Sequence, residues 1–290
     1  MTLKELLKEG EGCLKEAGLE EYNTDAWLLL SFVTGVSRAY YYAHPEEDVN
    51  EHDREKYRRL INKRSRRIPL QHLTHEAFFM GHVFYVDENV LIPRQDTETV
   101  VLECLKALEG IKEPCILDLC TGSGCILTSI LLERTDASGT GVDISAKALS
   151  VAERNAEALG TAERSEWILS DLFSSPGFNE NTSHSTPKYD ILVSNPPYIR
   201  TGILPSLMEE VRDHDPGIAL DGGEDGLTFY RRITEGAPRC LKPGGILLYE
   251  IGFDQADEVK MLLEHAGFAD IRVVKDLSGQ DRAVSGVLTR

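Results

Sequence analysis

Residues 116–125 have the sequence ILDLCTGSGC, and this stretch decides the fold. A short apolar run that passes through glycines into an amphipathic segment is typical of a strand followed directly by a helix. Gly122 and Gly124 allow a tight turn and a close approach of the backbone to a ligand at the carboxyl end of the strand, where doubly wound sheets bind their ligands. Position 127 holds Leu127 instead of a third glycine, which argues against the dinucleotide site of hydride-transfer enzymes.

Apolar runs of strand length recur after Pro93, and amphipathic segments separate most of them. This alternation predicts a doubly wound α/β domain, in which helices cover both faces of a parallel sheet. Only residues 277–281 lie between the last two runs, too few for a crossover, so the final strand is expected to be antiparallel. The expected strands are 115–120, 139–144, 165–170, 189–194, 244–251, 271–276 and 282–289.

The first seventy residues have the spacing of helices. Thr2 and Glu5 can form a capping box at the start of a first helix. A second helix is expected over about residues 23–35, where a glycine ends it. A third is expected to begin near Asn50 and to end at Pro69, because proline cannot continue a helix.

The pattern divides the chain into two domains. Short β-rich runs between residues 78 and 92 predict a hairpin that joins them. We therefore expect a helical domain at 1–75, a hairpin linker at 76–93 and the α/β domain at 94–290. Residues 174–188, rich in Ser, Asn, Thr, Pro and Gly, are expected to form a mobile surface insertion.

The charge balance argues against nucleic acid as a substrate. The chain has 31 Lys and Arg against 48 Asp and Glu, a net charge of −17 that repels phosphate backbones. Residues 54–67 are instead strongly basic, with only Glu55 as an acidic residue. Their basic residues are Arg54, Lys56, Arg58, Arg59, Lys63, Arg64, Arg66 and Arg67. A solvated helix face and a docking patch for an acidic partner are both open interpretations.

Other classes of protein are disfavoured by what the sequence lacks. The cysteines form no Cys-x-x-Cys pair and no His stands at zinc-ligand spacing, so we expect reduced thiols without metal or disulfide. Apolar runs are far shorter than the roughly 20 residues that a bilayer requires. No apolar signal core follows Met1, so a cytoplasmic location is expected.

Polar residues follow the next two expected strands. Asp143 ends the second strand, about 20 positions after the glycine turn, where a carboxylate can accept hydrogen bonds from ribose hydroxyls. Residues 170–173, with Asp171 and Leu172, end the third strand and are candidates to hold the edge and face of an adenine. Together with the glycine turn these strand ends predict an adenosine cofactor without pyrophosphate, such as S-adenosylmethionine. The alternative is that the glycines only form turns and the two aspartates cap helices.

The fourth strand ends in Ser194-Asn195-Pro196-Pro197-Tyr198. The prolines stiffen the chain, so that the carbonyl of Pro196 and the side-chain oxygen of Asn195 become fixed acceptors for a planar NH2 group. An amide nitrogen is a poor nucleophile because its lone pair is delocalised. Two acceptors that hold its hydrogens would favour the pyramidal nitrogen of the transition state, while Tyr198 packs against the planar group. A Pro-Pro turn that merely ends a strand is the alternative.

Over nearly its whole length the chain resembles the peptide chain release factor glutamine methyltransferases, also described as protein-(glutamine-N5) methyltransferases. The residues 195–198 are shared with DNA adenine-N6 methyltransferases, so they specify the chemistry better than the substrate. More specific are the matches VDENVLIPR at 86–94, Thr97-Glu98, ALDGGEDGL at 219–227 and FYR at 229–231. The chain departs from the family in two places. Cys120 occupies a position where the family commonly has glycine, so we expect the backbone of Cys120 to avoid torsions that favour glycine. Gln95-Asp96 replaces the usual Pro-Glu.

The resemblance implies a seven-stranded class I S-adenosylmethionine-dependent methyltransferase domain and a small N-terminal helical domain that recognises the substrate. The implied reaction is methylation of the side-chain amide nitrogen of the glutamine in the Gly-Gly-Gln motif of class I release factors, with S-adenosylhomocysteine as product. The cofactor would contact Cys120, Thr121, Gly122, Ser123, Gly124, Asp143, Asp171, Leu172 and Asn195. The target glutamine would lie at Asn195, Pro196, Pro197 and Tyr198, of which Asn195, Pro196 and Tyr198 would be catalytic.

We expect a monomer that needs no metal and binds neither nucleic acid nor membranes directly. Two other functions stay open. An adenine-N6 methyltransferase of nucleic acid is disfavoured by the net charge of −17. A catalytically idle cofactor-binding protein, with the helical domain as its interaction surface, is disfavoured by the intact residues 195–198.

Overall fold

The computed structural model describes residues 1–175, 178 and 189–289. Contacts within the chain divide it into two compact units. The first unit comprises Met1–Glu76 and Met208–His214, and the second comprises Ala77–Leu207 and Asp215–Arg290. The sequence pattern did not indicate that residues 208–214 belong with the N-terminal helices. Most of the expected insertion at 174–188 lies outside the described residues.

The first unit is helical, as predicted. Thr2 and Glu5 form the expected capping box, in which each backbone N–H donates to the other residue's side chain. Apolar side chains from four of the helices, among them Leu6, Leu30, Tyr57 and Leu73, fill its core. The helices are α1 (Leu3–Glu16), α2 (Tyr22–Thr34), α3 (Arg38–Ala43), α4 (Glu51–Arg64), α5 (Leu70–Thr74) and α9 (Glu209–Arg212).

The prediction that the third long helix ends at Pro69 was wrong. The helix α4 ends at Arg64, and Ser65 caps it through N–H bonds to Ile61 and Lys63. Arg67 then takes a left-handed φ of 68°, which turns the chain away from the helix axis. Pro69 instead precedes the first residue of α5, a position where its missing N–H costs nothing.

Ion pairs of Arg64 and Arg67 tie α9 to the N-terminal helices. The Arg64 guanidinium lies 2.6 Å from the Asp25 carboxylate and 3.3 Å from that of Glu210, and its side chain is only 11% exposed. Arg67 pairs with Glu209 at 3.4 Å and with Glu210 at 3.2 Å. Two cations of residues 54–67, the basic segment, therefore hold the acidic start of α9.

The basic segment is thus neither a uniform solvated face nor a uniform docking patch. Arg54 and Arg58 pair with Glu51 and Glu9, and Lys56 lies 5.0 Å from the centre of the Phe32 ring. Among the described residues, three exposed cations of this segment form no ion pair: Arg59, Lys63 and Arg66.

Arg64→Ala is expected to lower the stability of the first unit by about 3–5 kcal/mol, because it leaves the Asp25 carboxylate buried without its cation. Arg59→Ala on the same helix removes an exposed cation and is expected to cost less than about 0.5 kcal/mol. Urea unfolding of both variants, followed by tryptophan fluorescence, measures the difference. Equal losses would mean that the buried pair has no special weight.

The second unit is a seven-stranded sheet with the order β5-β4-β3-β6-β7-β9-β8. The strands β3 to β7 are parallel, and β9 is antiparallel to both of its neighbours. The predicted doubly wound sheet and its antiparallel last strand are confirmed. The strands are β3 (Cys115–Leu119), β4 (Ser138–Asp143), β5 (Ser165–Leu169), β6 (Tyr189–Ser194), β7 (Leu241–Glu250), β8 (Phe268–Lys275) and β9 (Asp281–Leu288).

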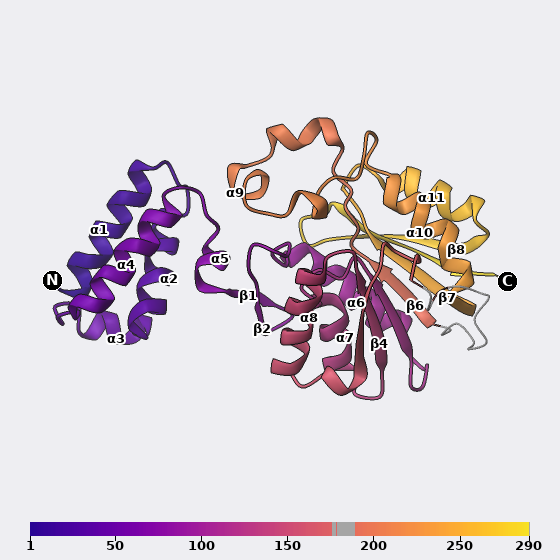
Figure 1. Ribbon diagram of the computed structural model, residues 1–290, viewed down its shortest axis with the longest axis horizontal. Helices are drawn as coiled ribbons and strands as arrows, with labels where there is room; N and C mark the ends of the chain where they lie inside the picture. Colours follow the sequence, from indigo (N-terminus) through magenta and orange to yellow (C-terminus); the bar gives the residue numbers. More distant parts are fainter. Residues whose placement is uncertain (176–177, 179–188, 290) are drawn as a thin grey trace. The chain divides into compact units, whose positions relative to one another are not determined.

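Helices cover both faces of this sheet (Figure 1). Ile116 of β3 packs with α6 (Glu98–Ala107) and α7 (Cys125–Glu133), and α8 (Ala146–Ala158) lies beside α7. Leu117 packs with α10 (Thr228–Gly236) and α11 (Ala256–His265) on the opposite face. Short 3-10 helices lie at Gln95–Thr97, Ala162–Arg164, Thr201–Ser206, Gly217–Ala219 and Ala237–Arg239.

The predicted hairpin is present as β1 (Glu76–Phe79) and β2 (His82–Tyr85). The Asn155 side chain of α8 exchanges hydrogen bonds of 2.7 and 3.0 Å with the backbone of Tyr85. The same side chain donates to the Ser123 carbonyl at 2.9 Å. One buried amide therefore connects the hairpin to the glycine turn that follows β3.

All six cysteines carry free thiols. No helix within the described part of the chain is both long and apolar enough to cross a membrane. Over the same residues, no group of three or more His, Cys, Asp or Glu side chains could hold a metal ion.

Candidate active site

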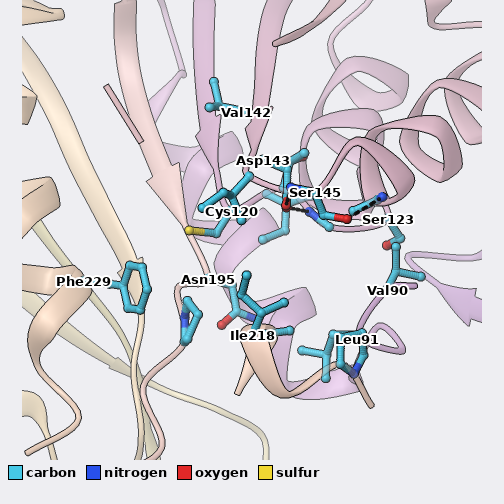
Figure 2. Close-up of a pocket in the computed structure, with 18 of the residues that line it drawn as sticks. Val90, Leu91, Cys120, Ser123, Val142, Asp143, Ser145, Asn195, Ile218 and Phe229 are labelled. Atoms are coloured by element: carbon cyan, nitrogen blue, oxygen red, sulfur yellow. Dashed lines mark hydrogen bonds between the residues drawn. The ribbon is translucent and has the colours of Figure 1, made fainter. Parts of the chain in front are cut away.

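A cavity of about 230 Å³ lies at the carboxyl ends of the parallel strands in the second unit. Figure 2 shows Ser123, Asp143 and Ser145 along one edge of it and Leu91, Asn195 and Ile218 along the opposite edge. Of the residues expected to bind cofactor or substrate, those that line it are Cys120, Thr121, Gly122, Ser123, Asp143, Asp171, Leu172, Asn195 and Pro197. Gly124, Pro196 and Tyr198 are not part of its wall.

The two glycines of the turn have different roles. A Cβ built at Gly122, whose φ is +54°, meets no atom within 4 Å, so the backbone there borders open space. A Cβ at Gly124 would lie 2.9 Å from side-chain atoms of Ala152 and Trp167. Gly122 therefore leaves room for a ligand, and Gly124 permits close packing of the helix α7 on its neighbours.

The expectation that Cys120 avoids torsions favourable to glycine was wrong. Its φ is +59°, in the left-handed region. The chain leaves β3 at Leu119 and turns before α7 begins at Cys125, and Cys120 takes this conformation at the start of that turn. For a residue other than glycine that conformation costs roughly 1–2 kcal/mol.

Asp118 holds the same turn from inside the sheet. Its carboxyl group is fully buried and accepts a hydrogen bond of 2.6 Å from the Thr121 hydroxyl. Burial raises the pKa of Asp118 to about 7. Sequence reasoning passed over this residue, although an acidic side chain inside an apolar strand was a signal for a buried polar contact.

Asp143 joins the glycine turn to the start of α8. One carboxylate oxygen accepts from the Gly122 N–H at 2.9 Å, and the other accepts from the Ser145 N–H at 2.9 Å. The N-cap of α8 is Ser145, whose hydroxyl accepts from Ala148 N–H, so Asp143 is not the helix cap. Burial raises the pKa of Asp143. Each of its oxygens keeps a lone pair for a ligand hydroxyl.

The third strand end contributes a charged pair and an apolar side chain. Asp171 forms an ion pair of 2.9 Å with Arg232, and both residues line the cavity. Leu172 is buried and takes a left-handed φ of 52°. Asp171 lies in a turn and does not cap a helix.

The loop that contains the ALDGGEDGL match, residues 219–227, contacts the backbone at and just after residues 195–198. Ile199 N–H donates to the Leu220 carbonyl at 3.0 Å, and Gly222 N–H donates back to Ile199 at 2.8 Å. A Cβ at Gly222 would lie 2.7 Å from the Cα of Tyr198, so only glycine fits there. The motif therefore fixes the backbone next to Asn195.

Two buried side chains hold Tyr198 itself. The Gln255 amide donates to the Tyr198 carbonyl at 3.1 Å, and the Tyr198 hydroxyl donates to the Glu250 carboxylate at 3.4 Å. Gln255 and Glu250 are 3% and 2% exposed, although neither was a candidate from the sequence. Burial raises the pKa of Glu250 to about 7.

The VDENVLIPR match contributes Val90, Leu91, Pro93 and Arg94 to the cavity wall. Arg94 forms an ion pair of 2.8 Å with Asp215, whose side chain is 1% exposed. That pair holds the segment that carries Ile218 to the cavity. Asp96, which departs from the family pattern, lies 3.5 Å from the guanidinium of Arg282. Sequence reasoning left out several lining residues that lie in or beside the specific motifs: Val90, Leu91, Arg94, Thr97, Ile218, Phe229 and Arg232.

Comparison with known proteins identifies the family. Residues 5–74 match the family model described as PrmC N-terminal domain, and residues 94–209 match the Methyltransferase small domain. A release factor glutamine methyltransferase of Clostridium acetobutylicum is 40% identical over 287 residues, which cover 99% of each chain. The chain belongs to the release factor glutamine methyltransferase family. A second member, from Caulobacter vibrioides, is 38% identical over 99% of this chain and 96% of its own.

A solved structure supports the fold independently. A methyltransferase from Pyrococcus furiosus superposes with a TM-score of 0.52 over 79% of this chain and 100% of its own, at 15% identity. At that identity the likeness concerns the fold alone. The predicted methyltransferase fold and the family resemblance are confirmed.

Proposed function

We propose that this chain transfers a methyl group from S-adenosylmethionine to the side-chain amide nitrogen of the glutamine in the Gly-Gly-Gln motif of class I peptide chain release factors. The observation that carries the proposal is the position of Asn195, at the end of β6 on the wall of the cavity that Asp143 and Gly122 also line. The membership of the chain in the release factor glutamine methyltransferase family supports the choice of substrate.

The residues around the cavity fit this cofactor. Asp143 has free lone pairs for two ribose hydroxyls, and Gly122 borders open space beside it. Leu172, Phe229 and Ile218 supply apolar surface for a purine ring. When bound, S-adenosylmethionine supplies a methyl group made electrophilic by its sulfonium.

Of the residues 195–198, Asn195 and Pro197 line the cavity, and we assign the amide to Asn195 and to the backbone carbonyl of Pro196 between them. The Asn195 side-chain oxygen and the Pro196 carbonyl would accept the two amide hydrogens and so hold the nitrogen lone pair toward the methyl group. Positive charge develops on the nitrogen as its bond forms, and two fixed acceptors stabilise that charge. The proton can leave afterwards to solvent, so no dedicated base is required.

We assign substrate recognition to the helical domain at 1–75, which the hairpin at 76–93 connects to the catalytic domain at 94–290. A site built around one side-chain amide reads little of the surrounding protein, so a second contact must select the release factor. We infer a cytoplasmic monomer that acts on release factors and does not bind nucleic acid. The net charge of −17 supports the last point.

The direct test offers labelled S-adenosylmethionine to the protein with three acceptors in turn: a class I release factor, its variant with Ala for the Gly-Gly-Gln glutamine, and duplex DNA. Label in the intact release factor alone supports the proposal. Label in DNA would favour an adenine-N6 methyltransferase. If none of the acceptors is labelled although the cofactor binds, the idle cofactor-binding protein becomes the better explanation.

Asp143→Ala is expected to weaken cofactor binding at least about tenfold, since a hydrogen bond to an ionised carboxylate contributes about 1.5–3 kcal/mol. The variant also releases Gly122, so affinity for S-adenosylhomocysteine is compared with that for its 2′,3′-dideoxy analogue. If Asp143 holds the ribose, calorimetry will show that the variant binds both ligands alike while the unmodified protein prefers the first. A preference that persists in the variant would place the ribose elsewhere.

A further inference from the structure

Glu250 is a buried carboxyl group beside the residues that hold the substrate amide. It is the last residue of β7, and the parallel register of β6 and β7 pairs Ser194 with Tyr249. Asn195 and Glu250 are therefore the next positions on two adjacent strands. The Glu250 side chain reaches the Tyr198 hydroxyl, and its second oxygen has no hydrogen-bond partner within 3.5 Å among the described residues.

We propose that Glu250 is a positioning residue for methyl transfer: its carboxylate fixes the hydroxyl, and with it the ring, of Tyr198. The inference rests on the proposed function and deepens it. Glu250 acts through Tyr198 and does not touch the reacting atoms, so its loss should affect turnover and leave cofactor affinity unchanged.

The charge state of Glu250 determines whether the Tyr198 hydroxyl can donate a hydrogen bond to another group or only accept one. An ionised carboxylate only accepts hydrogen bonds, so the Tyr198 hydroxyl must donate its single hydrogen to it. The remaining lone pairs of the phenolic oxygen are then acceptors only. Since the Gln255 amide also donates to the Tyr198 carbonyl at 3.1 Å, Tyr198 is held both at its backbone and at its hydroxyl. A protonated Glu250 could donate instead, which would free the phenol to turn its hydrogen elsewhere.

Burial of the Glu250 carboxyl group also has a cost in stability. Burial raises its pKa from 4.5 to about 7 against the opposing effects of the Thr97 hydroxyl, the Arg282 guanidinium and the Tyr198 hydroxyl, while Asp96 raises it further. The folded state therefore holds its proton more tightly than the unfolded state, so the stability of the protein falls as pH rises from about 4.5 through about 7. Glutamine at this position avoids that loss.

The test is Glu250→Gln, which keeps the size of the side chain and one acceptor oxygen but removes the charge. We expect kcat to fall about five- to tenfold, the difference between a charged and a neutral hydrogen bond, with cofactor Kd and release factor KM within about twofold. In the unmodified protein kcat should rise as pH passes through about 7, where Glu250 ionises. The variant should show a smaller rise, because Asp118, whose pKa burial also raises to about 7, is still present. At pH 8 the variant should melt at the same or a higher temperature.

Asp190→Asn is the matched control. Asp190 is a largely buried carboxylate of β6, the strand that leads to Asn195, but it pairs with Lys242 at 2.7 Å and does not line the cavity. It should leave both the pH profile and kcat unchanged. Tyr198→Phe should slow turnover, and combining it with Glu250→Gln should add less than about twofold if the two residues act as a unit.

Three results would overturn the assignment: an unchanged kcat and pH profile in Glu250→Gln, additive effects in the double variant, or a melting temperature at pH 8 that falls together with kcat. The last would show that Glu250 serves stability only. Failure of the unmodified protein to label the release factor would instead reject the proposed function, and the two failures are thereby distinguished.

Discussion

Replacing Asn195 with alanine is expected to slow methyl transfer about 100- to 1,000-fold, the usual cost of removing one preorganised group that stabilises developing charge. Among the described residues, the Asn195 side chain makes no hydrogen bond within the protein, so the fold should not depend on it. Cofactor affinity should change by less than about threefold, because the adenosine half of the cavity is formed by other strand ends. Single-turnover rates and calorimetry measure the two quantities separately.

Asn195→Asp separates the role of the acceptor oxygen from that of the neutral amide. It keeps an oxygen at the same place but adds a charge that must lose water when substrate covers the site. We expect this variant to fail as well. Near-normal single-turnover rates in either variant would mean that Asn195 does not hold the substrate amide.

Most of the sheet could be predicted because parallel strands buried on both faces form continuous apolar runs. For β3 the expected and observed ranges differ by one residue, and for β6 they coincide. The strand β7 begins at Leu241, before the expected 244, because Lys242 and Pro243 belong to the strand but break the apolar run. The helices α3 and α5 have six and five residues, too few for helical periodicity to be visible.

The site could be predicted as far as its residues stand at strand ends or in motifs. Asp143 and Asn195, which line the cavity, were predicted as candidates in this way. Glu250 and Gln255 were missed because the importance of a buried polar side chain lies in its partner, and the partner is known only once the chain is folded. For Asp118 the sequence showed an acidic residue inside an apolar strand, but not its partner Thr121. The same reason hid the attachment of residues 208–214 to Arg64 and Arg67.

Those ion pairs change how the recognition role of the helical domain should be tested. Deletion of residues 1–75 would remove Arg64 and Arg67 and leave the acidic segment at 208–214 without its partners. Activity lost in that way would say nothing about docking. Reversal of Arg67 or Arg58 would break ion pairs within the unit and has the same weakness.

The better variant reverses only the three exposed cations that form no ion pair among the described residues: Arg59, Lys63 and Arg66, each replaced with Glu. Arg59 and Lys63 share one face of α4, and Arg66 follows its end, so a single acidic surface of a release factor could contact all of them. At low salt we expect kcat/KM for a whole release factor to fall about 50-fold, because charges of this kind mainly steer and orient association.

Turnover of a short Gly-Gly-Gln peptide distinguishes docking from damage to the catalytic unit, and it should change by less than about twofold. The loss on whole release factor should shrink at high salt, where the attraction that the cations provide is already screened. The matched control, Lys8, Lys112 and Arg272 replaced with Glu, changes the net charge equally at exposed cations outside the segment. If the control variant loses as much kcat/KM on whole release factor, the effect is due to net charge alone. If the reversed variant loses as much activity on the peptide as on the whole release factor, the helical domain supports the catalytic unit rather than recognising the release factor.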